Sequence, residues 1–99
     1  MNDLSEIIET LRIPAAHPAL PGHFPGHPVV PGVVLLDGIA AALERSGSGR
    51  LARIGAVKFL APLRPEQQAD LRITRDGQRV RFRIDREGTP ILRGEGELA

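Results

Sequence analysis

The sequence has 99 residues, which is enough for one domain of ordinary size and too few for two. Hydrophobic residues make up 41% and charged residues 25%, a globular composition, and the absence of Cys excludes disulfides, thiolate metal sites and cysteine nucleophiles. A net charge of +1 without Trp or Tyr argues against a nucleic-acid partner, and no apolar stretch has the length of a signal peptide or membrane span, so we expect a soluble cytoplasmic domain.

Clusters of proline and glycine divide the chain into predicted elements. Alternation of polar and apolar residues predicts a first strand over residues 7–14. Residues 14–32 include six prolines, three glycines and three histidines, which predict an ordered but irregular loop of the kind that commonly serves a site. Residues 33–45 form the one predicted helix, which is apolar on nearly every side and is therefore expected to be wrapped by other structure.

The remainder of the chain predicts β structure. Asp76-Gly77 and Glu87-Gly88 are tight-turn signals between alternating segments. Four further strands are expected, over residues 51–60, 69–75, 79–85 and 91–98. The order of a strand, a loop, one buried helix and four antiparallel strands predicts a single α+β domain over residues 1–99.

Asp37 is the first residue that could carry chemistry, because it lies in the second turn of an otherwise apolar helix. A buried carboxyl group tends to hold its proton, and a neutral carboxylic acid can protonate a leaving group. The simpler interpretation is that Asp37 faces solvent or pairs with an arginine, and periodicity alone favours it.

His23 is a candidate general base because it lies in a loop stiffened by proline, which can fix the orientation of its ring. An ordinary loop histidine is the simpler interpretation of this residue taken alone. His17 and His27 lie in the same loop, but without Cys, an adjacent carboxylate or a helical spacing they do not predict a metal site. We expect neither a metal nor a cofactor.

The predicted helix starts without a side-chain cap, since Pro31-Gly32-Val33 offers no Ser, Thr, Asp or Asn. Its first N–H groups, at the positive end of the helix dipole, could bind a developing oxyanion, unless water simply hydrates them. A base, an acid and an oxyanion site in one segment suggest proton abstraction beside a carbonyl, followed by loss of a leaving group.

One stretch also resembles a known family. It reads His23-Phe24-Pro25-Gly26-His27-Pro28-Val29-Val30-Pro31-Gly32-Val33-Val34-Leu35-Leu36-Asp37, and it is similar to the signature of the 3-hydroxyacyl-acyl-carrier-protein dehydratases. Val57-Lys58-Phe59 followed by Pro62 and Pro65 resembles the family's next strand and turn. The resemblance implies a hotdog fold, in which an antiparallel sheet wraps one central helix. It also implies a homodimer or higher oligomer whose sheets join edge to edge, with active sites at the interface.

The resemblance also implies residue roles. His23 would be the catalytic histidine of one protomer and Asp37 the carboxylate supplied by the other, with Asp rather than Glu as in the 3-hydroxydecanoyl branch. Gly32, with Val33 beside it, would donate a backbone N–H to the thioester carbonyl, and the Val29 carbonyl would orient the histidine ring. The acyl tunnel would be lined by Phe24, Val34, Leu35, Ile39 and Phe59.

The implied activity is a hydro-lyase reaction: dehydration of a (3R)-hydroxyacyl thioester, carried by an acyl carrier protein, to the trans-2-enoyl thioester in fatty-acid or related lipid or polyene biosynthesis. Two positions differ from the family pattern. Ala41 stands where the family usually has Gln, and Pro65-Glu66-Gln67 lacks the usual Gly-Asp. These differences keep open a non-catalytic hotdog subunit that partners another dehydratase. A hotdog thioesterase, in which Asp37 activates water, is a further alternative.

Arginines alternate with apolar residues in the strand expected over residues 79–85. Arg79, Arg81 and Arg83 should therefore share one face, with Arg72 and Arg75 nearby on the neighbouring strand. Such a face could dock an acidic acyl carrier protein. The solvated side of an amphipathic sheet is the commoner explanation.

Overall fold

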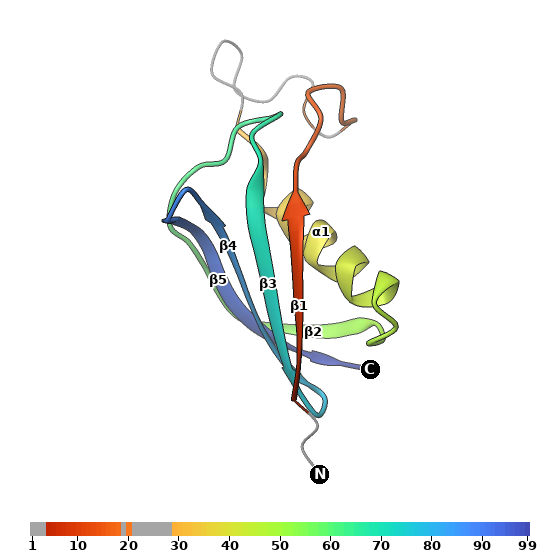
Figure 1. Cartoon of the computed structure of the whole chain (residues 1–99). Coiled ribbons are helices and arrows are strands. Elements are labelled where there is room, and N and C mark those ends of the chain that lie inside the picture. The colour runs from red at the N-terminus through yellow and green to blue at the C-terminus, as the bar shows by residue number, and fades with distance from the viewer. Residues whose placement is uncertain (1–3, 19, 21–28) are drawn as a thin grey trace.

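Five strands form one antiparallel sheet, and a single helix packs against it, within the residues that the computed structural model describes, 4–18, 20 and 29–99 (Figure 1). The elements are β1 (Leu4–Leu11), α1 (Gly32–Arg45), β2 (Leu51–Phe59), β3 (Ala69–Asp76), β4 (Arg79–Arg86) and β5 (Thr89–Leu98). This order confirms the predicted helix followed by four strands. The largest boundary difference is in β1, which starts and ends three residues before the predicted strand.

The sheet has the strand order β1-β3-β4-β5-β2, with antiparallel neighbours throughout. β1 ends at Leu11 because its ladder partner β3 begins opposite it, at Ala69. Tight hairpins join β3 to β4 and β4 to β5, and at the second turn both Glu87 and Gly88 have positive φ, as a two-residue hairpin turn requires. Helix α1 carries the chain from the β1 edge to the β2 edge.

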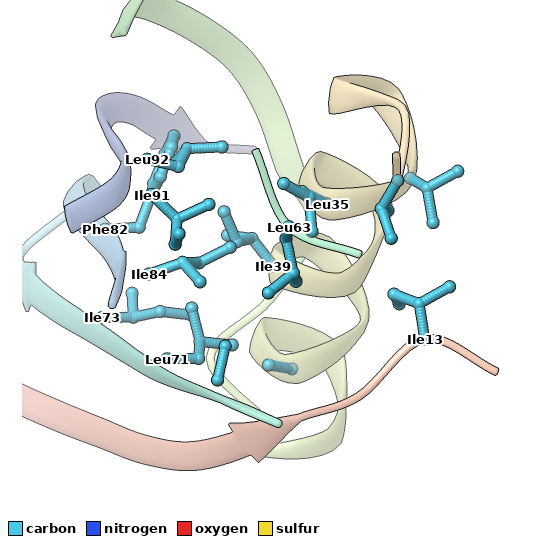
Figure 2. Close-up of a cluster of buried hydrophobic side chains, with 14 of the residues drawn as sticks. Ile13, Leu35, Ile39, Leu63, Leu71, Ile73, Phe82, Ile84, Ile91 and Leu92 are labelled. Carbon is cyan, nitrogen blue, oxygen red and sulfur yellow. The ribbon is translucent and has the colours of Figure 1, made fainter. Parts of the chain in front are cut away.

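The core lies between α1 and the inner face of the sheet (Figure 2). Alternate residues of β3 and β4 point inward, as the pattern predicts, and Ile73 and Ile84 are both 0% exposed. Ile39 and Leu43 of α1 meet them and are equally buried. Gly38 lets α1 pack closely against β1, because a Cβ at this position would lie only 3.1 Å from a methyl of Leu11.

Among the described residues, the side of α1 opposite the sheet is exposed, which corrects the expectation of a helix wrapped on nearly every side. Val33 is 63% exposed, and Asp37 and Glu44 are exposed as well. The reason is geometric, since one sheet covers one side of a helix. No helix in the described part of the chain is long and apolar enough to cross a membrane.

Replacing a core residue of the central strand should measure what this packing contributes. Ile84→Ala removes a side chain that is 0% exposed, and we expect it to lower the free energy of unfolding by about 2–5 kcal/mol. The matched control is Ile8→Ala, because Ile8 is 63% exposed on β1, and its loss should stay below about 1 kcal/mol. Chemical denaturation measures both, and equal losses would contradict the assigned core.

Candidate functional site

The start of α1 has unused hydrogen-bond donors. Pro31 is the N-cap residue and makes no side-chain cap, while its carbonyl accepts from the N–H groups of Val34 and Leu35 at 3.0 and 3.4 Å. Among the described residues, the N–H groups of Gly32 and Val33 have no hydrogen-bond partner. The positive end of the helix dipole therefore presents two donors that could bind an anionic oxygen. This agrees with the uncapped start predicted from the sequence.

A pocket of about 430 Å³ lies beside this helix start, and we call it the helix-start pocket. It is lined by Val29, Val30, Pro31, Gly32, Leu35, Phe59, Leu60, Ala61, Pro62 and Leu63. The Phe59 ring lies against Gly32, and a Cβ on Gly32 would be 2.5 Å from its Cε1 atom. Only glycine fits there while the ring keeps its place, so the Phe59 ring packs directly on the backbone at the helix start.

Several predicted site residues meet in this pocket and others do not. Val29, Gly32, Leu35 and Phe59 all line it. Val34 and Ile39 are instead buried in the core, at 4% and 0% exposure. Val33 lies on the uncovered side of the helix. His23 and Phe24 lie outside the described residues, so the structure does not place the proposed base.

Asp37 is exposed on α1 and is not among the residues of the helix-start pocket. Within the described part of the chain its carboxylate forms no ion pair. Arg45, in the last turn of the helix, pairs with Glu9 of β1 at 2.6 Å. In a single chain Asp37 therefore faces solvent. No described group of three His, Asp or Glu residues is placed to hold a metal ion.

Glu66, in the connection between β2 and β3, holds the start of the proline-rich loop. Its N–H donates to the Ile13 carbonyl at 2.8 Å, and its Oε2 accepts from the Ala15 N–H at 2.7 Å. Its Oε1 pairs with Arg12. Glu66 has a φ of 68°, a left-handed conformation that usually favours glycine. Sequence reasoning noted this position as a departure from a Gly-containing turn but did not predict its contacts.

The far end of the same loop is held by the same connection. The Val30 N–H donates to the Leu63 carbonyl at 2.7 Å. Both ends of the segment that contains His23 are therefore hydrogen-bonded to the residues between β2 and β3. This arrangement fixes where the loop leaves and re-enters the fold.

Arg79, Arg81 and Arg83 of β4 lie on the outer face of the sheet, as predicted. The residues that alternate with them, Val80, Phe82 and Ile84, are buried. Arg72 also lies on this face, opposite Arg83. Arg75 does not, and that expectation was wrong. It follows Leu71 and Ile73 in the inward alternation, pairs with Val80, and its Nε donates to the Gly77 carbonyl at 2.7 Å.

Comparisons with known proteins point in one direction. Residues 2–95 match the ApeI-like family, described as ApeI dehydratase. Curated relatives include the 3-hydroxyacyl-[acyl-carrier-protein] dehydratase FabZ of Lactobacillus helveticus, 31% identical over 88 residues (80% of this chain, 60% of that protein). The enzyme of the same name from Moorella thermoacetica is 38% identical over 77 residues (78% and 44%). The chain thus spans about half the length of the curated relatives it matches.

Solved structures confirm the hotdog fold. The dehydratase heterocomplex ApeI:P from Xenorhabdus doucetiae contains a chain that matches with a TM-score of 0.81 and 26% identity, covering 93% of this chain and 85% of that one. An uncharacterised protein from Erwinia carotovora subsp. atroseptica matches with a TM-score of 0.85 over 100% of this chain and 86% of its own. Its 23% identity supports the fold alone.

Removing the Glu66 carboxylate should loosen the start of the loop. Glu66→Ala loses the contacts to Arg12 and the Ala15 N–H, and we expect a loss of about 0.5–1.5 kcal/mol in the free energy of unfolding. Hydrogen exchange at the Ala15 amide should speed up. Glu66→Gln is the matched control, because its amide oxygen can still accept from that N–H. Unchanged Ala15 exchange in Glu66→Ala would show that the carboxylate does not hold the loop.

Proposed function

Because the chain belongs to the ApeI-like dehydratase family, we propose that it dehydrates a (3R)-hydroxyacyl thioester to the trans-2-enoyl thioester. The observation that carries this proposal is the uncapped start of α1 in an apolar pocket, directly after the loop that contains His23. Loss of the C2 proton puts negative charge on the thioester oxygen. Two unpaired N–H groups at a helix start stabilise that charge.

Each residue of the proposed site has a defined role. The Gly32 N–H, with that of Val33 beside it, donates to the carbonyl oxygen of the thioester. His23 takes the C2 proton, the C–H electron pair forms the C2=C3 double bond, and the C3–O bond breaks. Asp37 gives its proton to the departing hydroxyl, which leaves as water. The Val29 carbonyl orients the imidazole of His23.

The acyl chain is proposed to extend from the helix-start pocket along α1. Leu35 and Phe59 line this pocket, and Phe24 would extend its apolar wall. Val34 and Ile39, which the family resemblance also assigned to the tunnel, are packed in the core of this chain instead. The residues that would meet the acyl chain are apolar, which suits a hydrocarbon. The substrate class is therefore a fatty acyl or polyenoyl thioester in lipid or polyene biosynthesis. The names of the curated relatives support an acyl carrier protein as its carrier. We propose the cytoplasm as the place where the enzyme acts.

A complete site in this proposal needs two protomers. Asp37 lies outside the helix-start pocket of its own chain. β2 is an edge strand of the described sheet, and its exposed side chains include Ile54 at 44% and Phe59 at 55%. The backbone of an edge strand is a template for strand pairing. Pairing of β2 with its copy would join two sheets edge to edge. Asp37 of one protomer would then complete the pocket of the other.

Turnover of a panel of (3R)-hydroxyacyl-acyl-carrier-protein substrates tests the reaction directly, by the absorbance of the conjugated enoyl thioester. We expect His23→Ala and Asp37→Asn each to lower kcat/KM by about 10²–10⁴-fold, because each removes one proton-transfer group. Near-wild-type turnover in either variant would show that its assigned role is wrong. Release of free thiol without enoyl product would identify a thioesterase instead.

Complementation tests whether the histidine and the carboxylate come from different protomers. His23→Ala and Asp37→Asn chains, each inactive alone, should regain activity when refolded together. In a random mixture half of the dimers are mixed and each holds one intact site, so about a quarter of the wild-type activity should return. Two copies of the same variant refolded together serve as the control. Absence of recovery in proven mixed dimers would place both groups in one chain.

A second candidate is a subunit role in a mixed assembly. It is favoured by the ApeI:P structure, which is a heterocomplex of a dehydratase. In this case the chain would fold and bind a different hotdog chain at its β2 edge. Absence of turnover by the chain alone, with turnover on addition of such a partner, would identify this role.

A further inference from the structure

Four cations form one continuous row across the outer face of the sheet, and we call them the basic row: Arg72 of β3, Arg83 of β4, Arg93 of β5 and Lys58 of β2. Arg72 is the register partner of Arg83, Arg83 of Arg93, and Arg93 of Lys58. All lie on the outer face, because the residues that alternate with them, such as Leu71 and Ile84, are buried. Direct cross-strand partners of like charge repel each other.

The basic row is not a general consequence of a solvated charged face. Nearer the other end of the same strands, a second row reads Asp76, Arg79, Glu97 and Arg53 across β3, β4, β5 and β2. Its charges alternate in sign at every step, which is the stabilising arrangement. The same sheet therefore contains one row of like charges and one row of alternating charges. Because the row of like charges does not stabilise the fold, we look for its explanation in the binding of a partner.

Carboxylates near the basic row do not neutralise it. Asp85 is shared between Arg83 at 3.5 Å and Arg93 at 3.0 Å, and Glu6 approaches Arg72 only to 3.9 Å. The row lies in an outer groove of about 810 Å³, which is lined by five cations (Lys58, Arg72, Arg81, Arg83 and Arg93) against Glu6 and Glu95 among its described lining residues. Within the described part of the chain, Lys58 and Arg81 form no ion pair. The groove has an excess of positive charge.

The outer groove adjoins the helix-start pocket at one residue. Leu60 lines both the groove and the helix-start pocket. Lys58, at the end of the basic row, is next in sequence to Phe59, whose ring lies on Gly32. A body bound in the groove therefore lies beside the pocket in which the thioester carbonyl would meet the Gly32 N–H.

We propose that the basic row docks a carboxylate-rich helix of the protein that carries the acyl thioester, an inference that rests on the proposed function. Neighbouring strands place the cations about 4.8 Å apart, and successive turns of a helix repeat every 5.4 Å or so. Acidic side chains one turn apart can therefore each face one cation of the row. Arg81 and Arg83 take part in this surface, whereas Arg79 lies outside it in the alternating row.

Binding of purified holo acyl carrier protein at low salt tests the proposal without requiring turnover. The test variant Lys58→Gln with Arg72→Gln removes two charges from the basic row. The matched control, Arg53→Gln with Arg79→Gln, removes two charges from the alternating row. We expect the Kd of the test variant to rise about tenfold and that of the control to stay within about twofold. The wild-type affinity should fall with added salt.

Three results would overturn the docking surface: no binding of the carrier by the wild type, equal weakening in both variants, or binding of phosphatidylglycerol vesicles in place of the carrier. If the test variant does not fold, NMR of the wild type replaces it. Addition of the carrier should then shift the backbone amide signals of residues on the outer face of β2 to β5, and shifts elsewhere would overturn the docking surface. Carrier binding without turnover would reject the proposed function alone. Turnover of a hydroxyacyl N-acetylcysteamine thioester with unchanged carrier binding by the test variant would reject the docking surface alone.

Discussion

The alternation of side chains along β3 and β4 is the constraint on which the rest of the structure depends. Because Ile73 and Phe82 point toward α1, their neighbours Arg72 and Arg83 must point to the outer face. A slip of one residue would exchange the two faces and bury cations, which costs far more than any contact it could gain. One register therefore sets both the hydrophobic core and the charged outer surface. The register does not set whether a cross-strand pair of charges has like or opposite signs, because that depends on which residue stands at each position.

The helix start lies beside the end of β2 because two glycines of α1 let side chains of the sheet pack directly on the helix backbone. Gly38 brings α1 against Leu11 of β1, and Gly32 accepts the ring of Phe59. The connection between β2 and β3 then contacts both ends of the proline-rich loop, through Glu66 and through the Leu63 carbonyl. A few backbone hydrogen bonds thus tie the loop with His23 to the same segment that forms one wall of the pocket. Loop position and pocket shape are coupled for this reason.

Alternation and turn residues were enough to predict the helix, the four later strands and their order, because period and turn chemistry are local properties. Both ends of β1 were misplaced by three residues, since they are set by its pairing with β3, from Leu4 opposite Asp76 to Leu11 opposite Ala69, and that is a long-range contact. Arg75 was assigned to the wrong face although alternation alone places it with Leu71 and Ile73. The contacts of Glu66 and the rows of charge across the sheet depend on pairing between distant segments. No local pattern contains that information.

In the described structure the sheet covers one side of α1 and leaves the other side exposed, and this exposure links assembly to the proposed chemistry. The sheet buries Ile39 and Leu43 but leaves Val33 and Asp37 in solvent, while the edge of β2 remains unpaired. The parts absent from the helix-start pocket are the parts that a second hotdog chain would bring. An exposed carboxylate on a helix costs nothing in the free chain, whereas burial without a partner would be expensive. In the proposed mechanism, Asp37 on the exposed side of α1 lets each chain fold alone, and the proton-transfer site would form only when two chains associate.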